Sequence, residues 1–378
     1  MTDSVPPQDS SAGRPAASRV GVANFDALLA ELEQLSPALE EDSPGSWPET
    51  QFKRLAETGV LGWVIPPAYG GCELSPSDLT CGYEQIAAAC LPTAFVLTQR
   101  NGACQRIAGG ENEDLKAELL PCLNRGEIFA TVGISHLTTS RQHLRQPAVH
   151  VRVKGASLMF DGSVPWVTGA GHADYIVTGG TCDDGKQVLA AIPTAASGAT
   201  VQPPPRLLAL NSTQTGSVLL NGVEIDRRLV IAGPVERVMH RGQGGGTGSL
   251  TTSALAVGTA TRVLRLLKRE AENRPDLTEI HDALETECAS ISADMYRSLS
   301  GEPIAGEATP TSESIRRRAN SLVLRATQAY LAACKGAGFV EGHAAARAVR
   351  EAMFFLVWSC PQPVLTAALR EFACVVEA

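Results

Sequence analysis

The side chains best suited to chemistry lie in two segments near the middle of the chain. The first, Phe129-Ala-Thr-Val-Gly-Ile-Ser-His136, ends in a hydroxyl and an imidazole, and the second contains Trp166-Val-Thr168. Because histidine titrates near neutral pH, His136 is a candidate general acid or base. The alternatives are a loop histidine bonded to backbone, a core Trp166 and an ordinary strand residue at Thr168.

Two further segments have possible chemistry. In Trp358-Ser-Cys-Pro361 a nucleophilic Ser359 or Cys360 is conceivable, but no partner base is evident, and a packing role for Cys360 at the proline-flanked helix break is favoured. Gly242-Gln-Gly-Gly-Gly-Thr-Gly248 could contact a phosphate. Its spacing matches neither common phosphate-binding glycine motif, and no strand leads into it, so a flexible linker is favoured.

The composition indicates a globular protein with a mild negative charge. Apolar residues make up 44% of the 378 residues, and the net charge is −8 without a basic cluster. No apolar run reaches the roughly 18 residues of a membrane span, so we expect neither nucleic acid nor membrane as partner. Ten cysteines without a C-x-x-C pair predict no metal site and a reducing, cytoplasmic compartment.

The hydrophobic periodicity changes twice along the chain and predicts an α+β protein. Residues 22–127 and 250–378 follow helical spacing, whereas residues 128–235 alternate with a period of two, typical of a β-barrel or sandwich. Residues 1–21, rich in Ser, Pro and Ala, are expected to be a disordered tail, and residues 236–249 a Gly-rich linker.

Turn residues predict two hairpins within the β region. Asp183-Asp-Gly185 separates two apolar runs, and Asn221-Gly222 lies between Ser217-Val-Leu-Leu220 and Val223-Glu-Ile225. Both dipeptides favour the left-handed conformations that tight turns need.

Several motifs in this order resemble the acyl-CoA dehydrogenase family of flavoproteins. Glu57 to Gly71 is similar to the family's N-terminal signature, Trp166-Val-Thr168 to its Trp-Ile-Thr segment, and Arg350-Glu-Ala352 to its Arg-Asp-Ala helix start. The resemblance implies an N-terminal helical domain, a middle β domain and a C-terminal four-helix-type bundle.

The resemblance also implies a bound FAD. In the family, a β segment and its hydroxyl residue lie along the flavin ring, an aromatic residue packs on the ring, and a threonine bonds its N5 edge. A glycine turn, here Lys335-Gly-Ala-Gly-Phe339, lies near a neighbouring subunit's flavin, although a helix C-cap is an equal alternative. The implied cofactor residues are Val132, Ile134, Ser135, Trp166, Val167, Thr168, Gly336 and Gly338. A homodimer or homotetramer follows from the same resemblance.

The sequence departs from the family at the catalytic position. Family dehydrogenases remove the α-proton of an acyl thioester with a glutamate, but Ser359 occupies that position, and Thr251 occupies the alternative one. A serine hydroxyl is too weak a base for that step unaided. We therefore expect an FAD-dependent oxidoreductase acting on the CH–CH group of an acyl thioester, with His136 and Ser359 as candidate catalytic residues. The alternatives are a flavin monooxygenase and a non-catalytic relative that binds an acyl group or a partner.

Overall fold

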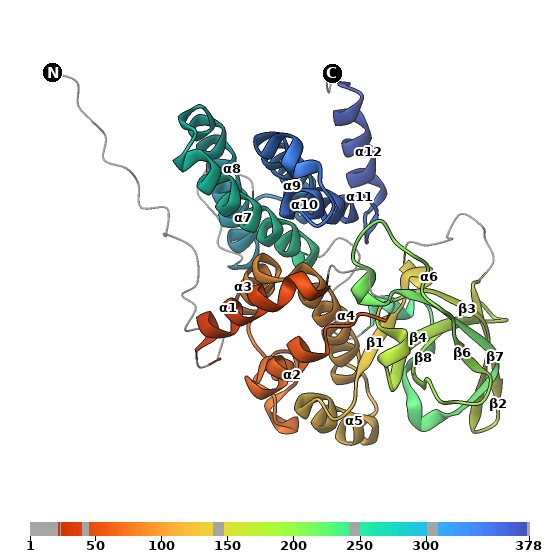
Figure 1. Ribbon diagram of the computed structural model, residues 1–378. Coiled ribbons are helices and arrows are strands. Elements are labelled where there is room, and N and C mark those ends of the chain that lie inside the picture. Colours follow the sequence, from red (N-terminus) through yellow and green to blue (C-terminus); the bar gives the residue numbers. More distant parts are fainter. Residues whose placement is uncertain are drawn as a thin grey trace.

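The structure, a computed structural model, describes residues 22, 24–39, 45–138, 147–241, 250–300 and 309–375. Figure 1 shows three parts in chain order: a group of helices, a sheet, and a second group of helices. The predicted helix, sheet, helix organisation is confirmed. Residues 1–21, whose disorder was predicted, and residues 242–249 of the predicted linker lie outside the described residues.

The N-terminal part is helical because its apolar residues recur at helix spacing and its ends carry capping residues. Ser75 accepts a hydrogen bond from the backbone of Asp78 at 3.1 Å, and Pro76 occupies the first helical position, where proline is favoured. The helices are α1 (Phe25–Leu35), α2 (Glu49–Glu57), α3 (Pro76–Ala89), α4 (Leu91–Ala108) and α5 (Glu113–Arg125).

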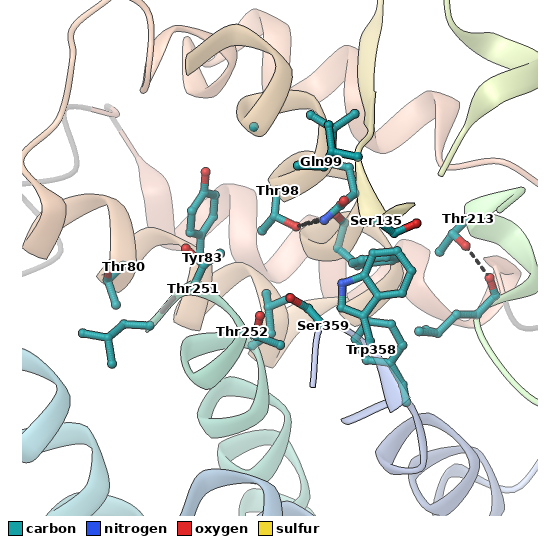
Figure 2. A pocket seen from close by; sticks show the side chains of 18 of the residues that line it. Thr80, Tyr83, Thr98, Gln99, Ser135, Thr213, Thr251, Thr252, Trp358 and Ser359 are labelled. Atoms are coloured by element: carbon teal, nitrogen blue, oxygen red, sulfur yellow. Dashed lines mark hydrogen bonds between the residues drawn. The ribbon is translucent and has the colours of Figure 1, made fainter. Parts of the chain in front are cut away.

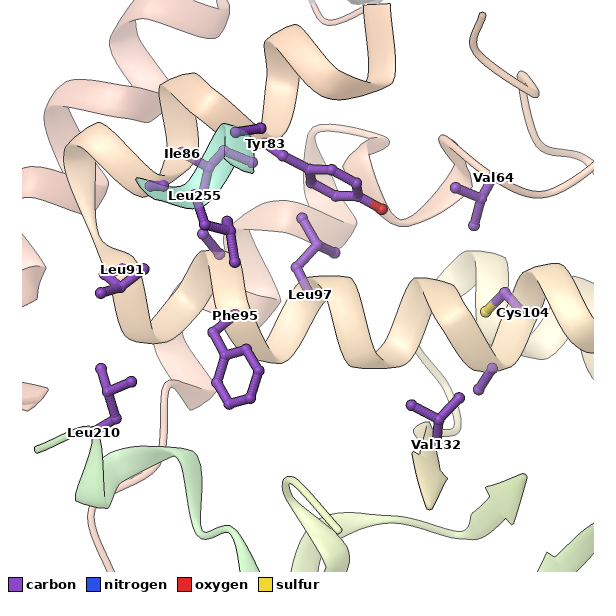
Figure 3. Packing of buried hydrophobic residues seen from close by; sticks show 14 of the residues in the cluster. Val64, Tyr83, Ile86, Leu91, Phe95, Leu97, Cys104, Val132, Leu210 and Leu255 are labelled. Atoms are coloured by element: carbon purple, nitrogen blue, oxygen red, sulfur yellow. The ribbon is translucent and has the colours of Figure 1, made fainter. Parts of the chain in front are cut away.

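Helix α4 lies at the centre of the molecule. Its N-terminal half is buried on several faces, which is typical of a helix surrounded by other elements. In Figure 3 Leu97 of α4 lies on the side of Tyr83 from α3, whereas Val132 lies below the helix, towards the sheet. Phe95 makes edge contacts with Phe354 and Trp358 from the C-terminal part. One helix thus contacts all three parts of the chain.

The middle part is one mixed sheet of eight strands, in the order β6-β7-β3-β2-β4-β5-β8, with β1 paired in parallel to β4. The strands are β1 (Ala130–Gly133), β2 (Val149–Lys154), β3 (Ser157–Val167), β4 (Tyr175–Cys182), β5 (Gln187–Pro193), β6 (Ala199–Val201), β7 (Gly216–Asp226) and β8 (Val230–Val235). A short helix, α6 (Ser135–Thr138), follows β1. This part contains the candidate residues of segments 129–136 and 166–168, among them His136, Trp166 and Thr168.

One hairpin prediction is confirmed and the other is wrong. The chain turns at Gly185, with φ of 81°, between the antiparallel strands β4 and β5. Asn221-Gly222, by contrast, lies inside the continuous strand β7, which pairs with β3 on both sides of this dipeptide. Gly222 has the positive φ, 62°, that the turn motif predicts. It lies opposite the register shift between Phe160 and Gly162, so its conformation forms an irregularity within the strand and not a turn.

The C-terminal part packs on α3 and α4 through long helices (Figure 1). Gly258 permits this packing, because a Cβ there would lie 2.1 Å from the carbonyl oxygen of Glu84. The helices are α7 (Leu250–Glu272), α8 (Thr278–Ser300), α9 (Ser312–Cys334), α10 (Ala344–Ala352), α11 (Phe354–Val357) and α12 (Gln362–Phe372). Over the described ranges, no helix is both long and apolar enough to cross a membrane.

Candidate functional site

A cavity of about 1350 Å³, here called the central cavity, opens where the three parts of the chain meet. Figure 2 shows side chains from each part around it, including Tyr83, Ser135 and Ser359. Its volume exceeds the roughly 300–1,000 Å³ that is usual for one small ligand. The cavity therefore has room for a cofactor and a substrate together.

Helix α4 forms one wall through a single stripe of side chains. Phe95, Thr98, Gln99, Gly102 and Arg106 line the cavity at spacings of three and four residues, which places them on one helix face. Thr98 donates to the carbonyl of Phe95 at 2.7 Å and accepts from Gln99 at 3.0 Å. These bonds hold the Thr98 and Gln99 side chains in place (Figure 2).

The sheet supplies the wall that holds the predicted flavin residues. Val132, Ile134 and Ser135 line the cavity, and so does Trp166. A register shift between Val164 and Val167 interrupts the pairing of β3, and Trp166 there has a φ of 56° and is 47% exposed. The interruption turns the indole into the cavity. The alternative of a core Trp166 is therefore wrong.

The other predicted residues of this segment lie behind that wall. Val167 is fully buried in the core, and Thr168 is buried without lining the cavity. The Thr168 hydroxyl lies 3.0 Å from that of Thr215, which lies 2.9 Å from that of Thr213. One hydroxyl, that of Thr215, therefore lies between Thr168 and the cavity surface.

The direction of this hydroxyl chain follows from its last bond. Thr213 donates its one hydrogen to the carbonyl of Leu210 at 2.8 Å, so it must accept from Thr215. Thr215 in turn must accept from Thr168. Thr213 and Thr215, which both line the cavity, consequently offer only lone pairs to a ligand.

The C-terminal part places Ser359 and Thr251 in the lining of the same cavity (Figure 2). Ser359 has a φ of 44° and follows Trp358. Two side chains of α9 hold the preceding turn: Arg316 donates to the carbonyl of Trp358 at 3.0 Å, and Asn320 donates to that of Phe355 at 2.8 Å. The two positions that the resemblance assigns to the family's carboxylate are thus both lining residues with hydroxyl side chains.

The titratable side chains named from the sequence lie elsewhere. His136, in α6, is not part of the cavity lining, and its Nε2 lies 2.9 Å from the carbonyl oxygen of Gly179, as the backbone-bonded alternative predicts. Among the described lining residues, Glu73 is the one carboxylate, and it is exposed. The described walls therefore place no buried carboxylate at the cavity surface.

Glu351, the family-like acid of α10, has a structural position. It is buried between Arg347, at 2.8 Å, and Arg262, at 3.1 Å. Burial by itself raises the pKa of its carboxyl, but the two arginines outweigh burial and hold that pKa below its ordinary value. The group is an ionised partner in a buried ion pair.

The glycines named as contacts to a neighbouring subunit's flavin do not line the central cavity. Gly336 and Gly338 belong to the short 3₁₀ helix Lys335–Phe339. A Cβ at Gly336 would meet open space, whereas one at Gly338 would lie 3.1 Å from the carbonyl of Leu331. Their predicted role stays a prediction.

Arg106 is a buried, charged lining residue that was not expected from the sequence. Only 7% of it is exposed, and burial lowers the pKa of its guanidinium to about 10. The available signal was an arginine on a helix rich in apolar residues, because arginine is almost never fully buried unless it is paired. No motif pointed to it.

Comparison with known proteins agrees with this geometry. Residues 29–127 match the family model described as the acyl-CoA dehydrogenase N-terminal domain. A probable acyl-CoA dehydrogenase of Bacillus subtilis, YngJ, is 25% identical over 61% of this chain and 63% of its own length. The chain thus spans somewhat less than two thirds of this relative.

Solved structures extend the likeness to nearly the whole chain. A glutaryl-coenzyme A dehydrogenase in complex with glutaryl-CoA has a TM-score of 0.76 at 17% identity, covering 93% of this chain and 96% of the other. KijD3, in complex with FMN and a dTDP-linked amino sugar, has a TM-score of 0.74 at 16% identity, covering 97% and 96%.

The fold and the cavity define a three-part protein of the acyl-CoA dehydrogenase class. By sequence, residues 29–127 match the acyl-CoA dehydrogenase N-terminal domain, and by fold the chain is similar to acyl-CoA dehydrogenases over most of its length.

Proposed function

We propose that this protein binds FAD in the central cavity and acts as an oxidoreductase on an acyl thioester or a related substrate. The carrying observation is that Val132, Ile134, Ser135 and Trp166, the residues expected at a flavin ring, line a single large cavity. The likeness to the family supports the same kind of cofactor: of the three proteins compared above, two are named as dehydrogenases and the third is a complex with FMN.

The residues present fit a flavin chemically. Trp166 offers a half-exposed aromatic face, Val132 and Ile134 offer an apolar floor, and Ser135 offers a hydroxyl. FAD, when bound, would supply the hydride acceptor for the oxidation. The protein's own contribution would be to orient the ring with Trp166 and Ser135 and to exclude water with the apolar floor.

The side chains around the cavity bear on which flavin reaction the protein catalyses. An α,β-dehydrogenation needs a base for the substrate's α-proton, and the hydroxyls of Ser359 and Thr251 are far too weak to serve. A flavin-dependent oxygenation does not need such a carboxylate. We therefore keep a flavin monooxygenase as the second candidate function, favoured by the hydroxyls at both base positions.

The first test is the visible absorption spectrum of the purified protein, followed by release and identification of the cofactor. We expect flavin bands and FAD. A colourless protein that takes up no added FAD would contradict the proposal and leave a fold used for binding alone.

The second test restores a carboxylate at the family position. We expect the FAD-loaded Ser359→Glu variant to be bleached by an acyl-CoA under anaerobic conditions, because a carboxylate can remove the α-proton that serine cannot. Ser298→Glu, which places a carboxylate elsewhere in the same lining, is the control and should stay coloured. If neither variant gains the reaction while FAD remains bound, the assignment of position 359 to the catalytic base is wrong. Oxygen consumption by the FAD-loaded protein then tests the monooxygenase function.

A further inference from the structure

Tyr83 of α3 places a buried hydroxyl group at the wall of the central cavity. The residue lines the cavity (Figure 2), yet only 3% of its surface is exposed. In Figure 3 the hydroxyl points towards Val64, which lines the cavity as well. The proposed function, as stated so far, assigns no role to this hydroxyl.

Arg100 fixes the direction of the hydrogen bonds behind Tyr83. A guanidinium only donates, so the amide atom of Asn101 that lies 2.8 Å from Nη1 of Arg100 is the oxygen Oδ1. The other amide atom, Nδ2, is then a donor, and it lies 2.9 Å from the hydroxyl oxygen of Tyr83. Tyr83 consequently accepts from Asn101, and its own hydrogen is left for another acceptor.

The surroundings of Arg100 and Asn101 hold this direction in place. Both side chains are fully buried in α4. Arg100 also donates to the carbonyl of Leu61, at 2.7 Å, and to that of Leu123. The guanidinium cannot turn away without breaking these bonds, and the amide of Asn101 cannot flip without placing its NH₂ group against a cation.

The hydrogen of the Tyr83 hydroxyl is not used within the described part of the chain. There, the amide of Asn101 is the one hydrogen-bond partner of this hydroxyl. Burial raises the pKa of Tyr83 although the charge of Arg100 opposes the rise, so the hydroxyl keeps its hydrogen at neutral pH. A buried donor without an acceptor is destabilising, and an acceptor on a ligand removes that penalty.

We propose that Tyr83 is a specificity-determining residue, whose hydroxyl donates a hydrogen bond to an uncharged oxygen on the acyl group of the substrate. A neutral donor suits a keto or hydroxyl oxygen, because a buried carboxylate needs a cation paired with it. The cation of this hydrogen-bond chain, Arg100, is separated from Tyr83 by Asn101.

The consequence for the substrate is a preference for an oxygenated acyl group over a plain alkyl chain. An alkyl chain leaves the buried donor of Tyr83 unpaired, and a site built around a hydrogen bond rejects the analogue that lacks it. The inference rests on the proposed function, because it takes the ligand of the central cavity to be an acyl thioester.

The test compares acyl-CoA thioesters that differ by one oxygen. Calorimetry on the FAD-loaded protein measures oxo and hydroxy acyl-CoA thioesters, with the oxygen at successive positions along the chain, against the unsubstituted thioester of the same length. The quantity of interest is the ratio of the two dissociation constants. A general weakening of the fold changes both constants alike, whereas loss of the Tyr83 hydrogen bond changes their ratio.

Tyr83→Phe removes the donor and keeps the ring. We expect wild type to prefer the oxygenated thioester by about tenfold at the matching position, and Tyr83→Phe to lose most of this preference. Tyr296→Phe is the matched control, because it also removes a buried tyrosine hydroxyl, one that donates to Glu84 at 2.8 Å and lies outside the cavity lining. It should keep the wild-type ratio.

Asn101→Asp reverses the last hydrogen bond while the tyrosine stays. A carboxylate at position 101 accepts from both Arg100 and Tyr83, and its charge is paired with that of Arg100. Tyr83 then spends its hydrogen inside the protein and offers the ligand only lone pairs. We expect the preference for an oxo thioester to be lost, and that for a hydroxy thioester to fall less, because a hydroxyl can also donate.

Several outcomes overturn the proposal. One is a wild-type protein without a preference for an oxygenated thioester at any position, and another is a folded Tyr83→Phe protein with the wild-type ratio. If Tyr83→Phe releases FAD and keeps the ratio, the donor serves the cofactor, and the assignment to the substrate is wrong. If Tyr83→Phe does not fold, an unchanged oxo preference in Asn101→Asp is the contradicting result.

Failure of the oxidoreductase proposal is seen separately, as a protein that binds no FAD. The same calorimetry on the flavin-free protein then decides the role of Tyr83, since the ratio of dissociation constants needs no turnover.

Discussion

Glu351 is a buried carboxylate in the C-terminal part, and it balances the charges of two arginines. Arg347 and Arg262 contact it at 2.8 and 3.1 Å, and Arg347 also donates to the carbonyl and hydroxyl of Ser36 at 3.1 and 3.0 Å. One acid therefore orients an arginine that ties α10 to the end of α1. Removing the charge would leave two buried guanidinium groups without their counter-charge.

We expect Glu351→Gln to lower the free energy of unfolding by about 3–5 kcal/mol, because it leaves buried charges uncompensated. The carboxyl pKa is lower in the folded protein, so its contribution is present above the ordinary value of about 4.3 and is lost as the pH falls below it. The variant should lack this part of the acid sensitivity. Urea unfolding across pH measures both effects.

Glu341→Gln is the matched control, since Glu341 is exposed and its replacement should change stability by no more than about 0.5 kcal/mol. Equal effects of the two substitutions would contradict the role given to Glu351.

At the scale of elements, the contact between α3 and α7 depends on one glycine. A Cβ at Gly258 would lie 2.1 Å from the carbonyl oxygen of Glu84 and 2.9 Å from Cβ of Ala87, closer than side-chain atoms approach. We expect Gly258→Ala to push α7 away from α3 and to lower the free energy of unfolding by about 1–3 kcal/mol. Thermal denaturation measures the loss.

Gly336→Ala separates this effect from the general consequence of replacing glycine, because a Cβ at Gly336 meets open space. A Gly258→Ala protein as stable as Gly336→Ala would mean that α3 and α7 do not pack as closely as described here.

At the scale of the whole molecule, an aromatic cluster joins the N-terminal helices to the sheet. The Trp47 ring, just before α2, stacks on His172 at 4.2 Å and meets Phe129 edge-on at 5.5 Å. Because α4 and this cluster contact the sheet at separate places, the cavity walls are held in register from two sides. The cluster is therefore expected to matter for stability more than for chemistry.

We expect Trp47→Ala to lower the free energy of unfolding by about 2–4 kcal/mol, through lost burial and lost ring contacts. Burial lowers the pKa of His172 despite the opposing effect of Glu49, so the unfolded state takes up its proton first as the pH falls below about 6.5. Wild-type stability should decrease in that range, and this decrease should shrink in Trp47→Ala.

Urea unfolding at about pH 8 and about pH 5 tests both statements. Trp166→Ala removes an equally large ring from a half-exposed position in the cavity, so it should lower the free energy of unfolding by less than Trp47→Ala does. If Trp166→Ala is the more damaging variant, the cluster around Trp47 is not the main link between these parts.

The sequence by itself determined the order of the parts, because helix and strand periodicity are local properties of neighbouring residues. It also indicated the family, and with it Ser135, Trp166 and Ser359 as residues of interest, all three of which line the cavity. It misjudged Asn221-Gly222, because the same dipeptide serves a turn or an irregularity within a strand, and only the pairing partner decides which.

Only the tertiary structure decided which polar groups share the cavity. Thr168 was separated from it by Thr215, and the direction of their hydroxyl chain depends on the carbonyl of Leu210, which no local pattern reveals. Arg106 entered the site because the one face of α4 that carries it turns towards β1. Such convergence depends on how distant elements pack, and packing is a property of the whole fold rather than of any segment.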